Sequence, residues 1–210
     1  MAAVATAARH SARATRTSGR RTRSQLLDAA SRLFRARGLA DVALTEIAAK
    51  ADAFPSQVTY YFGSKEALFV EAACRDVLHA AAAVEAAGRR TRTREQYARR
   101  LTEVALDSPA LLTFAEALLL ARTRSELRPL IARTLDRLHD EGARAVDDHY
   151  RARRWTLQAP AAAVARGFWA TVLGIALESA GAGGAFDLAA AQSAVLATLT
   201  VSATPRRPRP

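Results

Sequence analysis

The residues best suited to bind another molecule gather in one short stretch, "PSQVTYYFGSK", over residues 55–65. A glutamine amide can pair with the edge of adenine, and hydroxyl groups can reach bases or phosphate oxygens. The stretch supplies such groups in Ser56, Gln57, Thr59 and Tyr60, and a cation follows at Lys65. This set of side chains suits double-stranded DNA. The alternative is an ordinary surface turn of helix.

Two short helices are predicted to present these side chains as a helix-turn-helix. The first spans about residues 45–52, and the second spans about residues 55–62, where the proline suits a first helical turn. Residues three and four apart share a helix face, so Val58, Tyr61 and Phe62 can pack inward. The polar side chains of the second helix then lie on its outer side, where the major groove of DNA would meet them.

The composition predicts an all-helical protein of about nine helices. Glycine and proline are few, alanine, leucine, arginine and glutamate are frequent, and there are no runs of β-branched residues. A first helix is expected from about residue 21 to the stop signal at Gly38, and Ser64 is expected to cap a long helix that begins at Lys65. The expected domains are a head over residues 21–66 and a helical bundle over residues 67–203. A disordered basic arm is expected over residues 1–20, and a disordered tail over residues 204–210.

The positive charge is localised. Of the net charge of +11, most lies in residues 1–65, which carry eleven Lys and Arg against four Asp and Glu. A localised positive block is typical of a protein that binds a polyanion, although an arginine-rich solvated surface has the same composition. The basic arm could enter a minor groove or scan phosphates. A passive solubilising arm is the alternative.

Catalytic, metal and membrane functions find little support in the sequence. The four histidines are scattered without the spacing of a metal site, and no nucleophile elbow or phosphate loop is present. We therefore expect no catalytic residues, no metal and no cofactor. Cys74 is the single cysteine, which excludes an intrachain disulfide. The most apolar stretch, residues 167–177, is too short to span a bilayer. Together these features favour a cytoplasmic protein.

Residues 23–69 carry a compound motif that resembles the DNA-binding domain of the TetR/AcrR repressors. The shared features are "AA..LF...G" in the first helix, "T..IA..A" in the second, and "YYF.SKEALF" at the end. The resemblance implies an all-helical homodimer with a DNA-binding head and a ligand-binding, dimerising bundle. It implies that Thr45, the recognition-helix residues from Pro55 onward and Lys65 approach the operator. The lysine, at a helix N-terminus, would act as a phosphate clamp.

The sequence departs from the family pattern just before the recognition helix. Asp52, Ala53 and Phe54 stand where the family commonly has glycine, a small apolar residue and serine or threonine. Phe54 cannot cap a helix with its side chain. Pro55 and Ser56 also replace a frequent polar residue and a frequent glycine. Gln57 and Thr59 are the expected base-edge contacts.

The family architecture also implies an effector cavity and a subunit interface in the bundle. Candidates to line the cavity are Phe114, Leu118, Trp155, Phe168, Trp169 and Leu173, although such stripes are also ordinary core. The last two helices would pair with their mates as a four-helix bundle. The interface residues expected there are Phe168, Trp169, Val172, Ile175, Ala176, Leu188, Val195, Leu196 and Leu199.

The sequence therefore indicates a ligand-responsive, dimeric DNA-binding regulator, most often a repressor in this family, with a small and apolar effector. The alternative is a binding module that uses the same fold for a small-molecule or protein partner. Phe54 and Pro55, at positions that are usually polar, favour that alternative.

Overall fold

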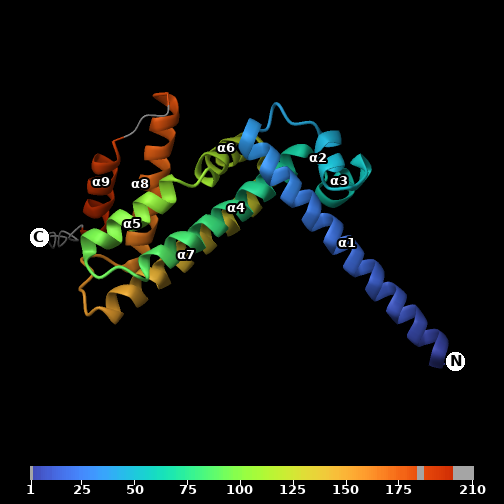
Figure 1. Ribbon diagram of the computed structural model, residues 1–210, viewed down its shortest axis with the longest axis horizontal. Helices are drawn as coiled ribbons and strands as arrows, with labels where there is room; N and C mark the ends of the chain where they lie inside the picture. Colours follow the sequence, from blue (N-terminus) through green and yellow to red (C-terminus); the bar gives the residue numbers. More distant parts are fainter. Residues whose placement is uncertain (1, 184–186, 201–210) are drawn as a thin grey trace, which may run out of the picture. The chain divides into compact units, whose positions relative to one another are not determined.

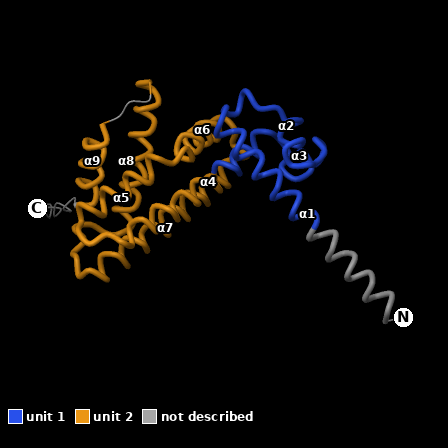
Figure 2. The backbone as a smooth tube through the Cα atoms, viewed as in Figure 1, with its two compact units in different colours: residues 1–73 blue, residues 74–210 orange. Residues whose placement is uncertain are grey.

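The computed structural model describes residues 2–183 and 187–200, with side chains described over residues 18–183 and 187–199. The chain divides into two compact units, residues 1–73 and residues 74–210 (Figure 2). Within the described residues the structure is entirely helical, with nine α-helices and one short 3-10 helix. The expected tail over residues 204–210 lies outside them.

The first unit contains three helices and the beginning of a fourth (Figure 1). These are α1 (Ala2–Arg37), α2 (Leu44–Lys50), α3 (Pro55–Phe62) and α4 (Lys65–Gly88). The predicted end signals hold. Gly38 follows α1 with a φ of 76°, and its N–H donates to the carbonyl of Phe34 at 2.7 Å. Ser64 caps α4, because its Oγ accepts from the N–H of Ala67 at 3.0 Å.

The start of α1 differs from the expectation. The helix begins at Ala2, so residues 2–20 of the arm that was expected to be disordered are helical in the structure. Alanine and arginine have high intrinsic helix propensities, and residues 2–17 contain no proline or glycine to end a helix. Helix propensity therefore accounts for this difference from the expectation.

One apolar cluster holds the head together. Leu26 and Phe34 of α1, Ile47 of α2 and Val58 of α3 are almost completely buried. The ring of Phe34 meets Phe69 of α4 edge-on, with ring centroids 5.2 Å apart. Because α4 contributes Phe69 and its neighbours to this cluster, the first unit extends to residue 73 rather than to the expected 66.

The second unit is a bundle built on the rest of α4. Its further helices are α5 (Arg94–Leu106), α6 (Ala110–Thr123), η1 (Ser125–Leu127), α7 (Arg128–Ala152), α8 (Ala161–Gly181) and α9 (Leu188–Thr200). Helix α8 packs against α6, α7 and α9 (Figure 1). Gly167 permits the close approach of α9, because a Cβ there would lie 2.5 Å from the methyl group of Thr198.

Helix α8 is more apolar than we expected. By length and composition it could cross a membrane, which corrects the prediction that no segment is apolar enough. The core helix of a soluble protein can have the same length and composition. Only 28% of the most apolar stretch of α8 is buried within the chain. An apolar face of α8 is therefore left uncovered in the single chain.

The backbone before α3 contains a left-handed residue that is not glycine. Asp52 has a φ of 50° and is exposed, at the position where the family pattern commonly has glycine. A side chain in this conformation is strained by about 1–2 kcal/mol, although aspartate and asparagine adopt it more readily than other residues.

We predict that Asp52→Ala is less stable than Asp52→Gly by about 1 kcal/mol, because only the glycine variant adopts a positive φ without a Cβ clash. Urea unfolding followed by circular dichroism measures the difference. Equal stabilities of the two variants would contradict a left-handed backbone at this position.

Candidate DNA interface and effector cavity

Helix α3 turns one face to the core of the head and the other to solvent. Val58 and Phe62 are buried, whereas Ser56, Thr59 and Tyr60 are exposed, with Tyr60 82% accessible. Tyr61 is half-buried, and a Cβ at Gly19 of α1 would lie 3.2 Å from its hydroxyl. The predicted division between inner and outer residues is therefore confirmed for these positions. Hydroxyl groups and an aromatic ring are available on the outer face.

The side chain of Gln57, unlike those of its exposed neighbours, is hydrogen-bonded to the start of its own helix. Its Oε1 accepts a hydrogen bond from the backbone N–H of Phe54 at 2.9 Å, and its own N–H donates to the carbonyl of Phe54 at 2.9 Å. The first of these bonds satisfies one of the N–H groups that a helix start leaves without a partner. The amide oxygen is thus already used, so a bidentate pair with adenine would require this cap to open. Its Nε2 can still donate outward.

Lys65 is also tied into the head. Its ammonium donates to the carbonyl oxygen of Val42 at 3.1 Å and approaches that of Ala40 at 3.5 Å. These carbonyls belong to the loop between α1 and α2, so the lysine fastens that loop to the start of α4. An ammonium has three donor directions, and one of them still allows a phosphate contact.

The remaining predicted DNA contacts lie on the surface of the head. Thr45 is exposed in the first turn of α2, although Ala43 rather than Thr45 is the N-cap residue. Pro55 is exposed at the first position of α3, beside Phe54, whose side chain is 75% accessible. The start of α3 therefore presents an apolar tip, which hydrogen-bond reasoning did not identify.

Arg23, three residues beyond the expected basic arm, has an internal role. Its guanidinium lies 2.6 Å from the Glu71 carboxylate and 4.8 Å from the centre of the Phe62 ring. A charge-assisted bond and a cation–π contact together hold the end of α3 against α1 and α4. Arg20 and Arg21, one turn earlier, are exposed and remain available to a polyanion.

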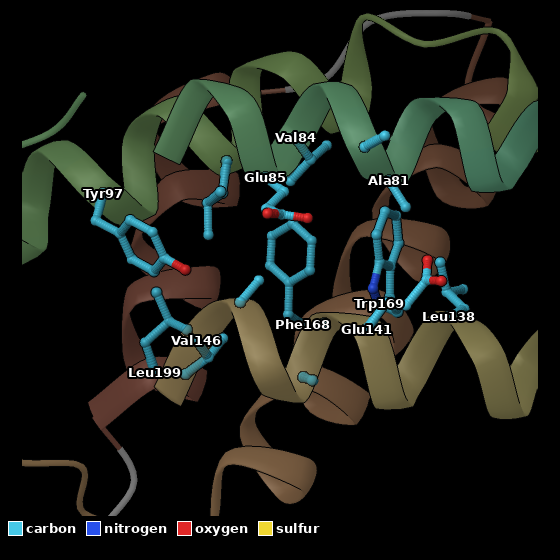
Figure 3. Close-up of a pocket in the computed structure, with 15 residues that line it drawn as sticks. Ala81, Val84, Glu85, Tyr97, Leu138, Glu141, Val146, Phe168, Trp169 and Leu199 are labelled. Atoms are coloured by element: carbon cyan, nitrogen blue, oxygen red, sulfur yellow. The ribbon is translucent and has the colours of Figure 1, made fainter. Parts of the chain in front are cut away.

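The second unit contains a cavity that is lined from α4, α5, α7, α8 and α9. It has a volume of about 70 Å³ and is bordered by the aromatic rings of Tyr97, Phe168 and Trp169. In Figure 3 the last two rings stand between α4 above and α7 below. Two carboxylates, Glu85 of α4 and Glu141 of α7, also line it. In the sequence, these two acids look like solvated charges on amphipathic helices.

A second, almost wholly apolar cavity adjoins the first. It has a volume of about 210 Å³ and is lined by Phe114 of α6 and Leu173 of α8, among others. Trp169 and Leu138 line both cavities. Four of the six predicted effector-site residues thus border a cavity. Leu118 and Trp155 border neither of the two.

Trp155 instead belongs to an aromatic cluster beside the first cavity. Its ring meets His149 and Tyr150 edge-on, and His149 stacks on Tyr97 with ring centroids 4.1 Å apart. Burial, with a smaller contribution from Arg153, lowers the pKa of His149 to about 4. Burial is also the main cause that raises the pKa of Tyr97. Both rings are therefore neutral at neutral pH, and Tyr97 connects this cluster to the wall of the first cavity.

The expected interface residues fall into two groups. Phe168, Trp169 and Val172 of α8 are buried inside their own chain, as are Val195 and Leu199 of α9. Apolar core and apolar interface have the same periodicity, so the sequence could not separate the two. Of the other expected residues, Leu188 is exposed, and Ile175, Ala176 and Leu196 are half-buried. Leu177, which was not among the expected residues, is also exposed. Among the described residues there is no group of three or more His, Cys, Asp or Glu that could hold a metal ion.

Each of the two units matches a known protein family. Residues 26–72 match the family described as bacterial regulatory proteins, tetR family, and residues 94–199 match that described as bacterial transcriptional repressor C-terminal. The chain is 37% identical to a proposed transcriptional regulator from Rhodococcus sp. RHA1, with a TM-score of 0.77, over 85% of this chain and 95% of the other. No protein of curated function matches the chain.

More distant structures share the fold. The multidrug binding protein EbrR complexed with ethidium is 25% identical, with a TM-score of 0.60, over 84% of this chain and 97% of the other. A proposed TetR-family regulator from Mesorhizobium loti MAFF303099 is 20% identical, with a TM-score of 0.65, over 86% and 94% of the two chains.

The cap formed by Gln57 can be tested with a matched pair of variants. We predict that Gln57→Ala lowers the free energy of unfolding by about 0.5–1.5 kcal/mol, the usual net value of one hydrogen bond. Gln57→Glu retains an acceptor for the Phe54 N–H and is expected to keep the stability of the parent. Urea unfolding of the two variants measures this. If the alanine variant is as stable as the glutamate variant, the amide oxygen is not used as a cap.

Proposed function

The chain belongs to the tetR family of bacterial regulatory proteins, and from this premise we propose that it is a ligand-responsive transcriptional repressor of the cytoplasm. A dimer binds a pseudo-palindromic operator, and a small molecule in the bundle releases it. The observation that carries this proposal is the orientation of α3. Burial of Val58 and Phe62 turns Ser56, Thr59 and Tyr60 outward on one face.

The outward groups divide into those that read bases and those that position the helix. Ser56, Thr59 and the Nε2 of Gln57 are short donors that suit base edges, and the exposed ring of Phe54 suits the methyl group of thymine. The hydroxyl of Tyr60, that of Thr45 and the third donor of Lys65 suit phosphate oxygens. Exposed Arg20 and Arg21 add charge that draws the head to DNA without reading sequence.

The uncovered face of α8 and α9 supports a dimer. Leu177 is 45% accessible and Leu188 of α9 is also exposed, on two helices that carry few charges. An apolar face that the single chain leaves open is typical of a protein interface. A two-fold dimer through this face would carry two α3 helices to two half-sites of an inverted repeat.

The cavity supports regulation by a small molecule. A cavity of about 70 Å³ holds only a few waters, so a larger effector must displace Trp169 or move the helices around it. Helix α4 contributes Ala81, Val84 and Glu85 to the cavity and begins at Lys65 in the head. An effector that binds a different position of α4 more tightly would shift the protein away from the DNA-binding state. Ethidium bound to the similar protein EbrR supports this use of the fold.

A second candidate function is a binding module with little affinity for DNA. The exposed ring of Phe54 beside Pro55 favours it, because an apolar tip also suits a protein partner. The two candidates differ in whether one DNA sequence is preferred.

We predict that selection from random duplexes enriches an inverted repeat. If the dimer neutralises about eight phosphates, the logarithm of the association constant should fall with the logarithm of salt concentration at a slope of about −7. Fluorescence anisotropy of a labelled selected duplex measures the slope. Failure to enrich any repeat, or a slope near −2, would favour the binding module.

The interface can be tested with a single charge. We predict that Leu177→Arg converts the dimer to a monomer, because a charge on the uncovered apolar face would be desolvated on association. The matched control is Leu119→Arg on α6, where the parent leucine is 61% accessible, and it should stay dimeric. Light scattering during size-exclusion chromatography gives both masses. A dimeric Leu177→Arg variant would place the interface elsewhere.

A further inference from the structure

The two cavities of the second unit differ in chemistry and share a wall. Trp169 and Leu138 border both. The first cavity is lined by Glu85 and Glu141 and by no Lys, Arg or His. The second is lined by apolar side chains together with His139 and Arg166. A molecule that reaches from one to the other therefore meets acids at one end and hydrocarbon at the other.

The carboxylates of the first cavity pair with surface arginines. Glu85 lies 3.3 Å from Arg89, and Glu141 lies 2.8 Å from Arg137, with both arginine side chains largely exposed. Exposed pairs of this kind contribute little, so a ligand cation can take over either carboxylate. Figure 3 shows Glu85 coming from α4 and Glu141 from α7, with the aromatic residues Phe168 and Trp169 between the two helices.

Aromatic faces add to the attraction for a cation. The rings of Tyr97, Phe168 and Trp169 border the same cavity as the two acids. A cation over an aromatic face is attracted by the ring quadrupole, more strongly where water is excluded. A quaternary ammonium group is weakly hydrated and is readily held by aromatic faces. An anion would be repelled by both carboxylates.

The second cavity favours the hydrocarbon portion of a ligand over a cationic group. Val77, Leu111, Phe114, Leu135 and Leu173 give it an apolar lining. The Arg166 guanidinium borders this cavity and would repel a further positive charge, and burial together with Arg166 lowers the pKa of the neighbouring His139. A bound cation is therefore oriented, with its charge in the first cavity and its hydrocarbon in the second.

We propose that the effector is an amphiphilic organic cation. Its charged group lies between Glu85 and Glu141 against the aromatic rings, and its apolar portion passes Trp169 into the cavity bordered by Phe114 and Leu173. This inference rests on the proposed function, because it names the chemical class of the effector. It replaces the purely apolar effector that the sequence indicated.

The test uses Trp169 as a reporter. The chain has two tryptophans, so Trp155→Phe leaves Trp169 as its single indole. The full-length Trp155→Phe protein is titrated with butyl-, hexyl- and octyltrimethylammonium below their micellar concentrations, and intrinsic fluorescence is followed. Affinity should rise about fourfold for each added methylene until the second cavity is full. The uncharged alcohols of matched length should bind at least tenfold more weakly.

Substitutions in each cavity show which end of the ligand binds there. Glu85→Gln and Glu141→Gln should each lower the affinity for octyltrimethylammonium about five- to tenfold, and the double variant should bind the cation no better than octanol. Glu178→Gln, an exposed acid of α8 that lines neither cavity, is the matched control and should bind as the parent does. Leu173→Phe should flatten the dependence on chain length without removing the preference for a cation.

The outcomes separate this inference from the proposed function, because the titration needs no DNA. Equal binding of alcohol and ammonium, equal losses in Glu178→Gln and Glu85→Gln, or no fluorescence change in a folded dimer would each overturn the cationic class. The operator selection would then remain an independent test of the proposed repressor. A protein that binds the ammonium series as expected but enriches no repeat would support the effector class and contradict the repressor.

Discussion

The function depends first on the burial of two side chains of an eight-residue helix. A helix as short as α3 is not stable alone in water, where about 12–15 residues are needed even for favourable sequences. Its position therefore comes from burying Val58 and Phe62, each of which stabilises the head by about 1.5–3 kcal/mol. Arg23 adds a contact to the ring of Phe62 from α1. The same burial decides which side chains are outside, so the stability of the head and the composition of its DNA-binding face have one cause.

In the proposed function, helix α4 connects the effector cavity to the head. Lys65 at its start holds the loop before α2 through two carbonyl groups, and Glu85, twenty residues later in the same helix, lines the first cavity. A ligand can change DNA affinity only by the difference between its affinities for two states. Couplings of this kind are typically about 1–3 kcal/mol, which is comparable to a few side-chain contacts.

Local signals made much of the fold predictable. Gly38, Pro55 and Ser64 act within one turn of their own positions, and they mark helix ends correctly. Partners that come from distant residues could not be predicted. The carbonyl groups that receive Lys65 lie more than twenty residues earlier in the chain. Phe168 and Trp169 follow an apolar stripe that suits core and interface equally, and only the folded chain shows that they are buried. The acids of the cavity look like solvated charges until the neighbouring helices are placed.

The start of α3 is held without the usual side-chain cap. Phe54 lacks the hydroxyl with which serine or threonine would accept from a backbone N–H of the first turn, and the N–H of Gln57 donates to the Phe54 carbonyl instead. The Gln57 side chain in turn accepts from the backbone N–H of Phe54, which is the other half of a capping box. The consequence is a trade between stability and recognition, because this bond uses one acceptor site of the Gln57 amide oxygen and fixes the orientation of the amide. The exposed ring of Phe54 and the hydroxyls of Ser56 and Thr59 are then left to distinguish one sequence from another. Loss of the serine cap and the apolar character of the recognition surface thus follow from the same substitution.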